Sequence, residues 1–188
     1  MKNILKDIKL NFATLILFGL LFPLSIWAIG LFFPAQASGL PIYKNGELIG
    51  FENIGQNFYS DKYFWGRPSA VDYNAAATGG SNKGPTNPDY LAEVETRIQD
   101  FLAKNPEVKR SEIPSDLVTA SGGGLDPHIA QQAAFIQIAR VADARNLDRR
   151  TLQKLVEENI EPPFLGMFGP SKVNVLKLNL SLDELKIN

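Results

Sequence analysis

Three consecutive glycines, Gly122 to Gly124, stand just before Asp126 and Pro127, a pair typical of a helix start. Backbone N–H groups at a helix start attract anions, so this turn is the nearest approach in the chain to a phosphate-binding loop. No Gly-Lys-Ser or Gly-Lys-Thr follows it, and Asp126 would place a carboxylate where a phosphate would lie. A capped structural turn is therefore favoured, and an anion site is the alternative.

Nucleophilic and acid–base chemistry has little support in the residue pattern. His128 is the only histidine, and near a cap such a residue is more often a local hydrogen-bonding group than a base. Thr119 to Gly123 lacks the Gly-x-Ser-x-Gly form of a nucleophile elbow. Two carboxylates could converge for glycoside chemistry, although their spacing does not require it. The candidates for such a pair are Asp61, Asp72, Asp89 and Asp116.

The composition excludes several classes of site. The chain has no cysteine, which excludes disulfides, zinc–thiolate sites, iron–sulfur clusters and a thiol nucleophile. A single histidine also excludes a multi-histidine metal centre, so no metal site is expected. The net charge is −1, and Lys and Arg form no stripe, so nucleic acid is not an expected partner.

The elements that must position these residues fall into two parts. No charged residue occurs in the 34 positions between Lys9 and Lys44, and residues 12–33 are almost wholly apolar. At about 1.5 Å per residue, these 22 positions reach roughly 33 Å, enough to cross a hydrocarbon core of about 30 Å. We therefore expect a cytoplasmic N-terminus at 1–9, a transmembrane helix at 10–33, kinked at Pro23, and one further domain at 34–188.

The flanking charges indicate the orientation of this span. Positive residues, including Lys6 and Lys9, precede it, whereas Lys44 and Glu47 follow it, so the N-terminus is expected in the cytoplasm and residues 34–188 outside the membrane. A cleavable secretory signal is the alternative, because residues 35–37 read Ala-Gln-Ala. The apolar run is longer than the core of about 7–15 residues usual in such signals, which favours a retained span.

The periodicity of residues 34–188 predicts an α+β (mixed α/β) extracytoplasmic domain. Asn87, Pro88 and Asp89 open one helix, Asn146 is a plausible left-handed stop, and Asp148 caps a later helix. The expected elements are one strand or two short strands in 47–58, a long loop over 63–88, a helix to Lys104, a short strand in 113–121, helices over 127–145 and after Asp148, and a strand over 172–182.

The long loop is the first place to expect a partner surface, because loops beyond about 12–15 residues in a compact domain are often functional. Aromatic residues from Tyr59 to Trp65 stand beside Arg67 at its start. They could form an exposed docking patch or a cluster packed under the loop, and both interpretations remain open.

Several blocks of the sequence resemble one known family. They are FWGRPSA at 64–70, YN at 73–74, GGSN at 79–82, GPTNP at 84–88, PSDLVTASG at 114–122, GLDPHI at 124–129, VNVL at 173–176 and LNL at 178–180. Together with the single N-terminal span, these blocks resemble the C subunit of the Kdp high-affinity potassium-transporting P-type ATPase. The resemblance covers nearly the whole chain in the family's order.

The resemblance implies a non-catalytic accessory subunit of a bacterial inner-membrane complex, with one transmembrane pass. Its partners would be a potassium-conducting subunit and an ATP-hydrolysing subunit. In that family the subunit is described as a catalytic chaperone that raises the ATP affinity of the ATP-hydrolysing subunit, so ATP is a possible ligand although no cofactor of its own is expected. A membrane-anchored extracytoplasmic hydrolase using Asp and Ser residues is the alternative function.

Two groups of candidate residues follow from the sequence and the resemblance. The candidate partner-contact loop comprises Phe64, Trp65, Arg67, Tyr73, Asn74, Ser81, Asn82, Thr86 and Asn87. The candidate nucleotide contacts are Gly79, Gly80, Gly122, Gly123, Gly124 and Gln137.

Overall fold

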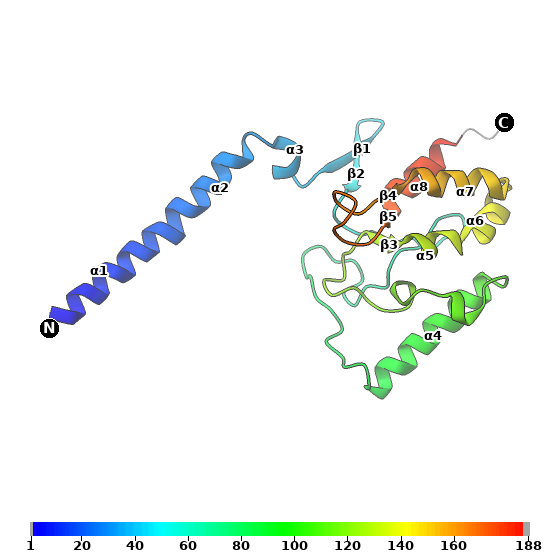
Figure 1. The fold of residues 1–188 in the computed structure, drawn as a ribbon, viewed down its shortest axis with the longest axis horizontal. Helices are drawn as coiled ribbons and strands as arrows, with labels where there is room; N and C mark the ends of the chain where they lie inside the picture. The colour runs from blue at the N-terminus through cyan, green and yellow to red at the C-terminus, as the bar shows by residue number, and fades with distance from the viewer. Residues whose placement is uncertain (1, 186–188) are drawn as a thin grey trace. The chain divides into compact units, whose positions relative to one another are not determined.

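The computed structural model describes residues 2–185, which divide after Ile49 into two compact units. The N-terminal unit begins with helix α1 (Lys2–Ile16), a π-helical turn η1 (Leu17–Leu21) and helix α2 (Phe22–Gly30). Figure 1 draws these three elements as one continuous helix. The helix over Ile4–Gly30 has 27 residues, and an 18-residue window within it has a mean hydropathy of 2.2, so the helix is long and apolar enough to cross a membrane.

The helix accommodates Pro23 by widening one turn. Proline has no backbone N–H and disturbs the regular hydrogen bonds of an α-helix. Here Phe22 donates its N–H to the carbonyl oxygen of Leu17, five residues earlier, and Pro23 then lies at the start of α2. The disturbance expected at Pro23 therefore takes the form of a π turn, and the helix ends at Gly30, three residues before the expected end of the span.

A short helix α3 (Pro34–Ala37) and a hairpin of β1 (Pro41–Lys44) and β2 (Glu47–Phe51) follow. Asn45 and Gly46 connect the strands with φ of 52° and 86°, the left-handed geometry that tight hairpin turns require. The strand expected in residues 47–58 is confirmed over Glu47–Phe51, whereas β1 was not expected from the sequence.

The second unit, from Gly50 onward, contains a three-stranded antiparallel sheet in the order β3-β5-β4. Its strands are β3 (His128–Ala130), β4 (Ile160–Glu161) and β5 (Lys172–Asn174). The helices are α4 (Pro88–Lys104), α5 (Gln131–Phe135), α6 (Ile138–Arg145), α7 (Arg149–Glu158) and α8 (Val175–Glu184), with 3-10 turns η2 (Arg110–Glu112) and η3 (Ser115–Leu117). Figure 1 shows α5 to α8 gathered around this small sheet. The predicted α+β class with one N-terminal apolar helix is confirmed.

Several predicted elements of this domain are confirmed. Asn87 caps α4 by accepting a hydrogen bond from Tyr90 N at 3.0 Å, and Asp148 caps α7 by accepting from Thr151 N at 3.1 Å. Asn146 ends α6 with φ of 52°. Between β2 and α4 the described chain contains turns and bends but neither helix nor strand, so the long loop is also confirmed.

Three other expectations were wrong. Residues 113–121 form no strand, since η3 occupies their centre. Residues 127–145 are not one helix: β3 pairs with β5 first, and the helical part then breaks between α5 and α6. Residues 172–182 leave the sheet at Asn174, which caps α8 by accepting from Lys177 N at 3.2 Å, so the second part of the expected strand, from Val175 onward, is a helix.

The core packs the sheet against the helices. Its fully buried members come from every part of the unit and include Phe64, Ile129, Val141, Leu152, Val156, Val173 and Leu178. Among the described residues, four amide side chains with at most 3% exposure lie in this core: Asn105, Gln137, Asn174 and Asn179. A buried amide is costly unless it is hydrogen-bonded. The hydrogen-bond partners of these side chains therefore identify the parts of the chain that the amides fix in place.

Candidate partner-binding site

The start of the long loop is held by two buried amide side chains. Asn179 on α8 accepts from Phe64 N and donates to Phe64 O, both at 2.9 Å. Gln137, just before α6, accepts from Trp65 N at 2.8 Å and donates to Trp65 O at 3.2 Å. Consecutive residues of an extended chain point their backbone groups to opposite sides. The Asn179 and Gln137 side chains therefore bind the segment of Phe64 and Trp65 from its two opposite sides. We call these four residues the amide clamp.

Arg140 on α6 fixes the same segment from another direction. Its guanidinium carbon lies 4.0 Å from the ring centroid of Trp65, within the range of a cation–π contact. Its hydrogen-bond acceptors are the carbonyl oxygens of Asp61 (2.6 Å) and Tyr63 (3.0 Å), Oδ1 of Asn105 (3.2 Å) and Oε1 of Gln137 (2.7 Å). Burial lowers the pKa of Arg140 to about 10, so the buried side chain still carries its charge at neutral pH.

The next turn of the loop is organised by Ser69 and Tyr73. Ser69 Oγ accepts from Val71 N at 3.2 Å and from Tyr73 N at 2.9 Å, a pattern typical of a side-chain-stabilised turn. The Tyr73 hydroxyl donates to the carbonyl oxygen of Arg67. Burial raises the pKa of Tyr73 to about 12, so this hydroxyl keeps its proton over the whole physiological range.

A cavity of about 320 Å³ opens beside this part of the loop. Trp65, Arg67 and Tyr73, three of the candidate partner residues, line it together with Phe58, Arg97 and Asp100. Its walls therefore combine aromatic rings with charged groups of both signs, the mixture that protein interfaces favour around a central anchor residue. The cavity could receive a side chain from a partner protein.

The other candidate partner residues have differing roles. Phe64 is fully buried and belongs to the core, so only its backbone position bears on the loop surface. Asn87 is occupied as the cap of α4, and Asn82 holds a left-handed turn with φ of 53°. Asn74 and Thr86 are exposed, and Ser81 is half-buried. The aromatic residues at the start of the long loop are thus partly packed into the domain and partly form one wall of the open cavity.

The two glycine segments of the candidate nucleotide site do come together. Gly79 donates its N–H to Gly123 O at 3.1 Å, and a Cβ on Gly80 would lie 2.8 Å from Gly122 O. Gly124 has φ of +70°, and a Cβ there would lie 2.5 Å from a methyl group of Val71. The glycines therefore allow two backbone segments to approach closely.

Gln137 does not join these glycines, because both ends of its side chain are used in the amide clamp. The helix start that would have favoured an anion is also missing, since Asp126 leads into β3. Its Oδ1 accepts from His128 N at 3.0 Å, and its Oδ2 lies 2.9 Å from Arg67 Nη1. A carboxylate paired with arginine thus occupies this turn.

A chain of ionisable side chains that the sequence did not reveal links the two outer strands of the sheet, β3 and β4. His128 places Nδ1 3.4 Å from Asp126 and Nε2 3.6 Å from Glu161, and Glu161 pairs with Lys172 at 3.4 Å. The hydrogen bond from the His128 side chain is the main cause that lowers the pKa of Asp126 to about 2, with Arg67 adding to it. His128 is therefore a local hydrogen-bonding residue.

Three of the four carboxylates considered for hydrolysis have separate partners. Asp61 pairs with Lys104 at 2.9 Å, Asp72 accepts from the Tyr59 hydroxyl at 3.4 Å, and Asp116 accepts from Ala130 N at 2.6 Å. Asp89 lies in the first turn of α4. Among the described residues, no group of three or more His, Cys, Asp or Glu side chains is placed to hold a metal ion.

The comparisons with known proteins all identify the same family. A family model described as "K+-transporting ATPase, c chain" matches residues 4–184. A protein of Flavobacterium psychrophilum is 52% identical over 99% of this chain and 100% of its own length. Proteins of Caldanaerobacter subterraneus subsp. tengcongensis and Bacteroides fragilis are 50% and 46% identical, covering 98% and 99% of this chain and 97% and 99% of their own lengths. All three bear the name "Potassium-transporting ATPase KdpC subunit".

Proposed function

Because the chain belongs to the KdpC family, the c chain of the potassium-transporting ATPase, we propose that it is the non-catalytic accessory subunit that assembles and stabilises the Kdp complex. Its partners are the potassium-conducting subunit and the ATP-hydrolysing subunit. The observation that carries the proposal is the amide clamp, which gives a loop without helix or strand a fixed shape. A preformed surface binds without the entropic cost of ordering a flexible loop.

The proposed location is the bacterial inner membrane, with a single pass through the uncharged part of the N-terminal helix, residues 10–30. Lys6 and Lys9 lie at the N-terminal end of the helix, and Lys44, Glu47 and Glu52 follow its other end. The excess of lysine at the first end supports a cytoplasmic N-terminus. In this orientation the domain from Gly50 onward lies outside the cytoplasm, beside the extracytoplasmic mouth of the potassium-conducting subunit.

The orientation bears on the proposed role as a catalytic chaperone. ATP is cytoplasmic, whereas this orientation puts the glycines of the candidate nucleotide site on the opposite side of the membrane. We therefore propose that the chain raises the ATP affinity of the ATP-hydrolysing subunit indirectly, through contacts within the complex. The Arg67 to Asp126 pair at the glycine turn supports this, because a carboxylate there opposes a phosphate.

Deleting residues 73–86 should weaken association with the potassium-conducting subunit in detergent. That deletion also removes Tyr73, which bonds to Arg67, so a milder variant is needed. Ala75→Lys with Ala77→Lys adds charge at two exposed loop positions, and Ala92→Lys with Ala103→Lys does the same on exposed positions of α4. Loss of copurification and potassium uptake in the loop variant alone is the expected result. Unchanged copurification in both loop variants would contradict the proposal.

The orientation and the ATP effect can be tested together in oriented, sealed vesicles containing the complex. Since the chain lacks cysteine, Gln153→Cys, at an exposed position of α7, provides a unique thiol in this chain for an impermeant reagent. A photoreactive ATP analogue is then added from either side. We expect the reporter to react from outside, and the analogue to label only the ATP-hydrolysing subunit, only from the cytoplasmic side. Labelling of this chain would show direct nucleotide binding.

A further inference from the structure

The segment between β4 and β5 exposes four large apolar side chains. Phe164, Leu165, Met167 and Phe168 are 72%, 71%, 75% and 60% exposed. No charged residue occurs between Glu161 and Lys172. Figure 1 shows this segment as a loop beside the small sheet, and we call residues 163–169 the apolar finger. Exposed apolar groups of this size, gathered on one segment, mark an interaction site.

The apolar finger has a fixed shape. Phe164 and Phe168 face each other as an antiparallel pair, each N–H donating to the other's carbonyl oxygen at 2.9 Å. Leu165 and Gly166 make the reversal with φ of 53° and 73°. The tip is therefore a small hairpin that presents its side chains without further ordering.

The backbone of the apolar finger distinguishes between possible partners. Besides the Phe164 and Phe168 pair, Gly166 N donates to Pro163 O at 2.9 Å and Met167 N donates to Phe164 O at 3.2 Å. Prolines 162, 163 and 170 have no N–H to satisfy. Lipid offers no hydrogen-bonding partners to backbone groups, so a segment that enters it must satisfy them internally. Four N–H groups of the finger, on Phe164, Gly166, Met167 and Phe168, are satisfied internally, which favours lipid over a protein partner.

The base of the apolar finger is polar. Lys172 Nζ lies 3.4 Å from Glu161 Oε2, and these two residues pair in register on β5 and β4. Both side chains are partly exposed. An apolar tip above a charged base is the arrangement of segments that lie at the boundary between lipid headgroups and acyl chains.

The membrane anchor brings lipid within reach of this tip. Nineteen residues separate the last residue of the apolar helix, Gly30, from the first residue of the domain, Gly50. Fully extended, they span less than about 70 Å, and the β1–β2 hairpin shortens this reach. We propose that the apolar finger inserts into the headgroup–acyl boundary of the bilayer that holds the chain's own span. The proposal rests on the membrane anchoring proposed above.

The test uses the full chain in vesicles of phosphatidylethanolamine and phosphatidylglycerol. Single cysteines carry an environment-sensitive fluorophore at Leu165→Cys or Met167→Cys in the finger, at Gln153→Cys on the exposed face of α7, and at Leu20→Cys in the span. Lipids with a spin-label quencher near the headgroup replace part of the bilayer. We expect both finger labels to emit at shorter wavelength than the Gln153→Cys label and to lose most of their fluorescence to the quencher.

The span label separates failure of the anchor from failure of the inference. If Leu20→Cys is shielded from an aqueous quencher but the finger labels behave like Gln153→Cys, the lipid contact is wrong. If the finger labels become shielded only after the other Kdp subunits are added, the finger binds protein, which also overturns the proposal. If Leu20→Cys itself remains in water, the proposed anchoring fails, and the lipid contact fails with it.

Discussion

The side-chain amide of Gln137 forms both hydrogen bonds that a neighbouring β-strand would form with Trp65, accepting from its N–H and donating to its carbonyl oxygen. Asn179 does the same for Phe64. An extended loop is thus integrated into the core without becoming part of a sheet. Because these hydrogen bonds come from side chains, each set can be removed by a single substitution. The backbone hydrogen bonds between two strands cannot be removed in this way.

Gln137→Leu should lower the free energy of unfolding by about 3 kcal/mol, because two backbone groups of Trp65 and one N–H of Arg140 lose a buried partner. Urea unfolding of the full chain in detergent, followed by circular dichroism, measures the change. Gln132→Leu on the exposed face of α5 is the matched control and should change little. Equal effects in the two variants would contradict the clamp.

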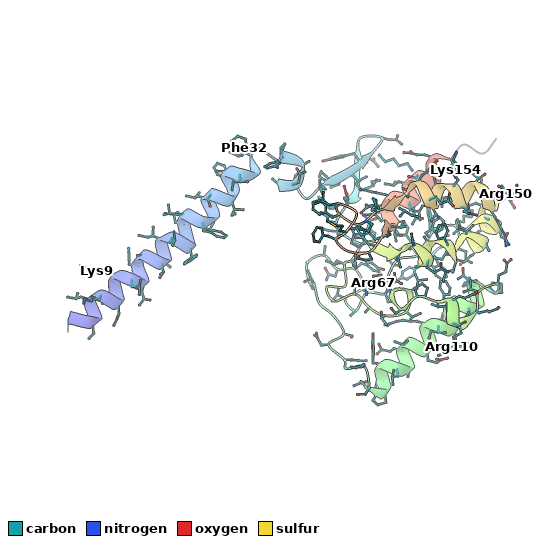
Figure 2. All side chains as sticks on the ribbon, viewed as in Figure 1. Lys9, Phe32, Arg67, Arg110, Arg150 and Lys154 are labelled. Atoms are coloured by element: carbon teal, nitrogen blue, oxygen red, sulfur yellow. The ribbon has the colours of Figure 1, made fainter. Side chains whose placement is uncertain are left out.

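Arg140→Lys should destabilise the domain by about 2–4 kcal/mol although it keeps the charge. A lysine ammonium cannot reach four acceptors and lie flat on Trp65 as the planar guanidinium does. Arg150→Lys, on the outer face of α7 (Figure 2), is the control. Comparable unfolding midpoints for the two variants would show that Arg140 acts only as a charge.

Gly124→Ala should destabilise the loop by more than about 1 kcal/mol, because its φ of +70° and the nearby Val71 methyl both oppose a Cβ. Gly123→Ala has open space around its Cβ and is the matched control, neutral or slightly stabilising. Thermal unfolding of the two variants checks this. A Gly123→Ala effect as large as that of Gly124→Ala would show that turn flexibility matters more than close approach.

Stability below pH 4 should depend on Asp126. A carboxyl with a pKa of about 2 when folded and 3.8 when unfolded contributes stability that is present above pH 3.8 and lost as the pH falls through 2. Asp126→Asn should therefore flatten the dependence of unfolding free energy on pH between 2 and 4. His128→Leu should flatten it too, because the hydrogen bond from His128 is the main cause of the lowered pKa.

Denaturant unfolding at several pH values measures this slope for each variant. Asp100→Asn, at an exposed carboxylate of α4, is the control and should keep more of the original slope. A wild-type slope in Asp126→Asn would mean that other carboxylates set the acid stability.

The parts of the fold that depend on local chemistry could be predicted from the sequence. Asn87 and Asp148 cap helices and Asn146 ends one, because each acts within a few residues of its own position. The apolar span was similarly evident, since membrane insertion depends on composition and length. The long loop was located correctly for the same reason, as Gly and Pro punctuate it.

The helix α8 was missed because of a polar residue on its buried face. Leucines at every second position from 176 to 182 predicted a strand. The side chains that are buried include Val175, Leu178, Asn179 and Leu182, at the spacing of three and four typical of a helix. Asn179 faces inward because it holds Phe64, a contact that no local pattern reveals.

The candidate site shows the same limit. The sequence located the loop but offered Phe64 as a candidate partner contact and Gln137 as a candidate nucleotide contact, whereas both side chains lie in the core beside distant partners. The chain of ionisable side chains through His128 depends on β3 and β4 lying on either side of β5. Such contacts between distant residues arise from tertiary structure, and the spacing of residues along the chain does not predict them.

The amide clamp also sets an order of events during synthesis. Phe64 and its partner Asn179 are 115 residues apart in the chain, so the backbone of Phe64 lacks this partner until α8 has been made. At about 5–20 residues per second, the aromatic segment stays without this contact for several seconds at least. The domain thus cannot complete its fold progressively from the N-terminus. It must wait for α8, and until then the backbone groups of Phe64 lack the Asn179 amide that pairs with them in the folded domain.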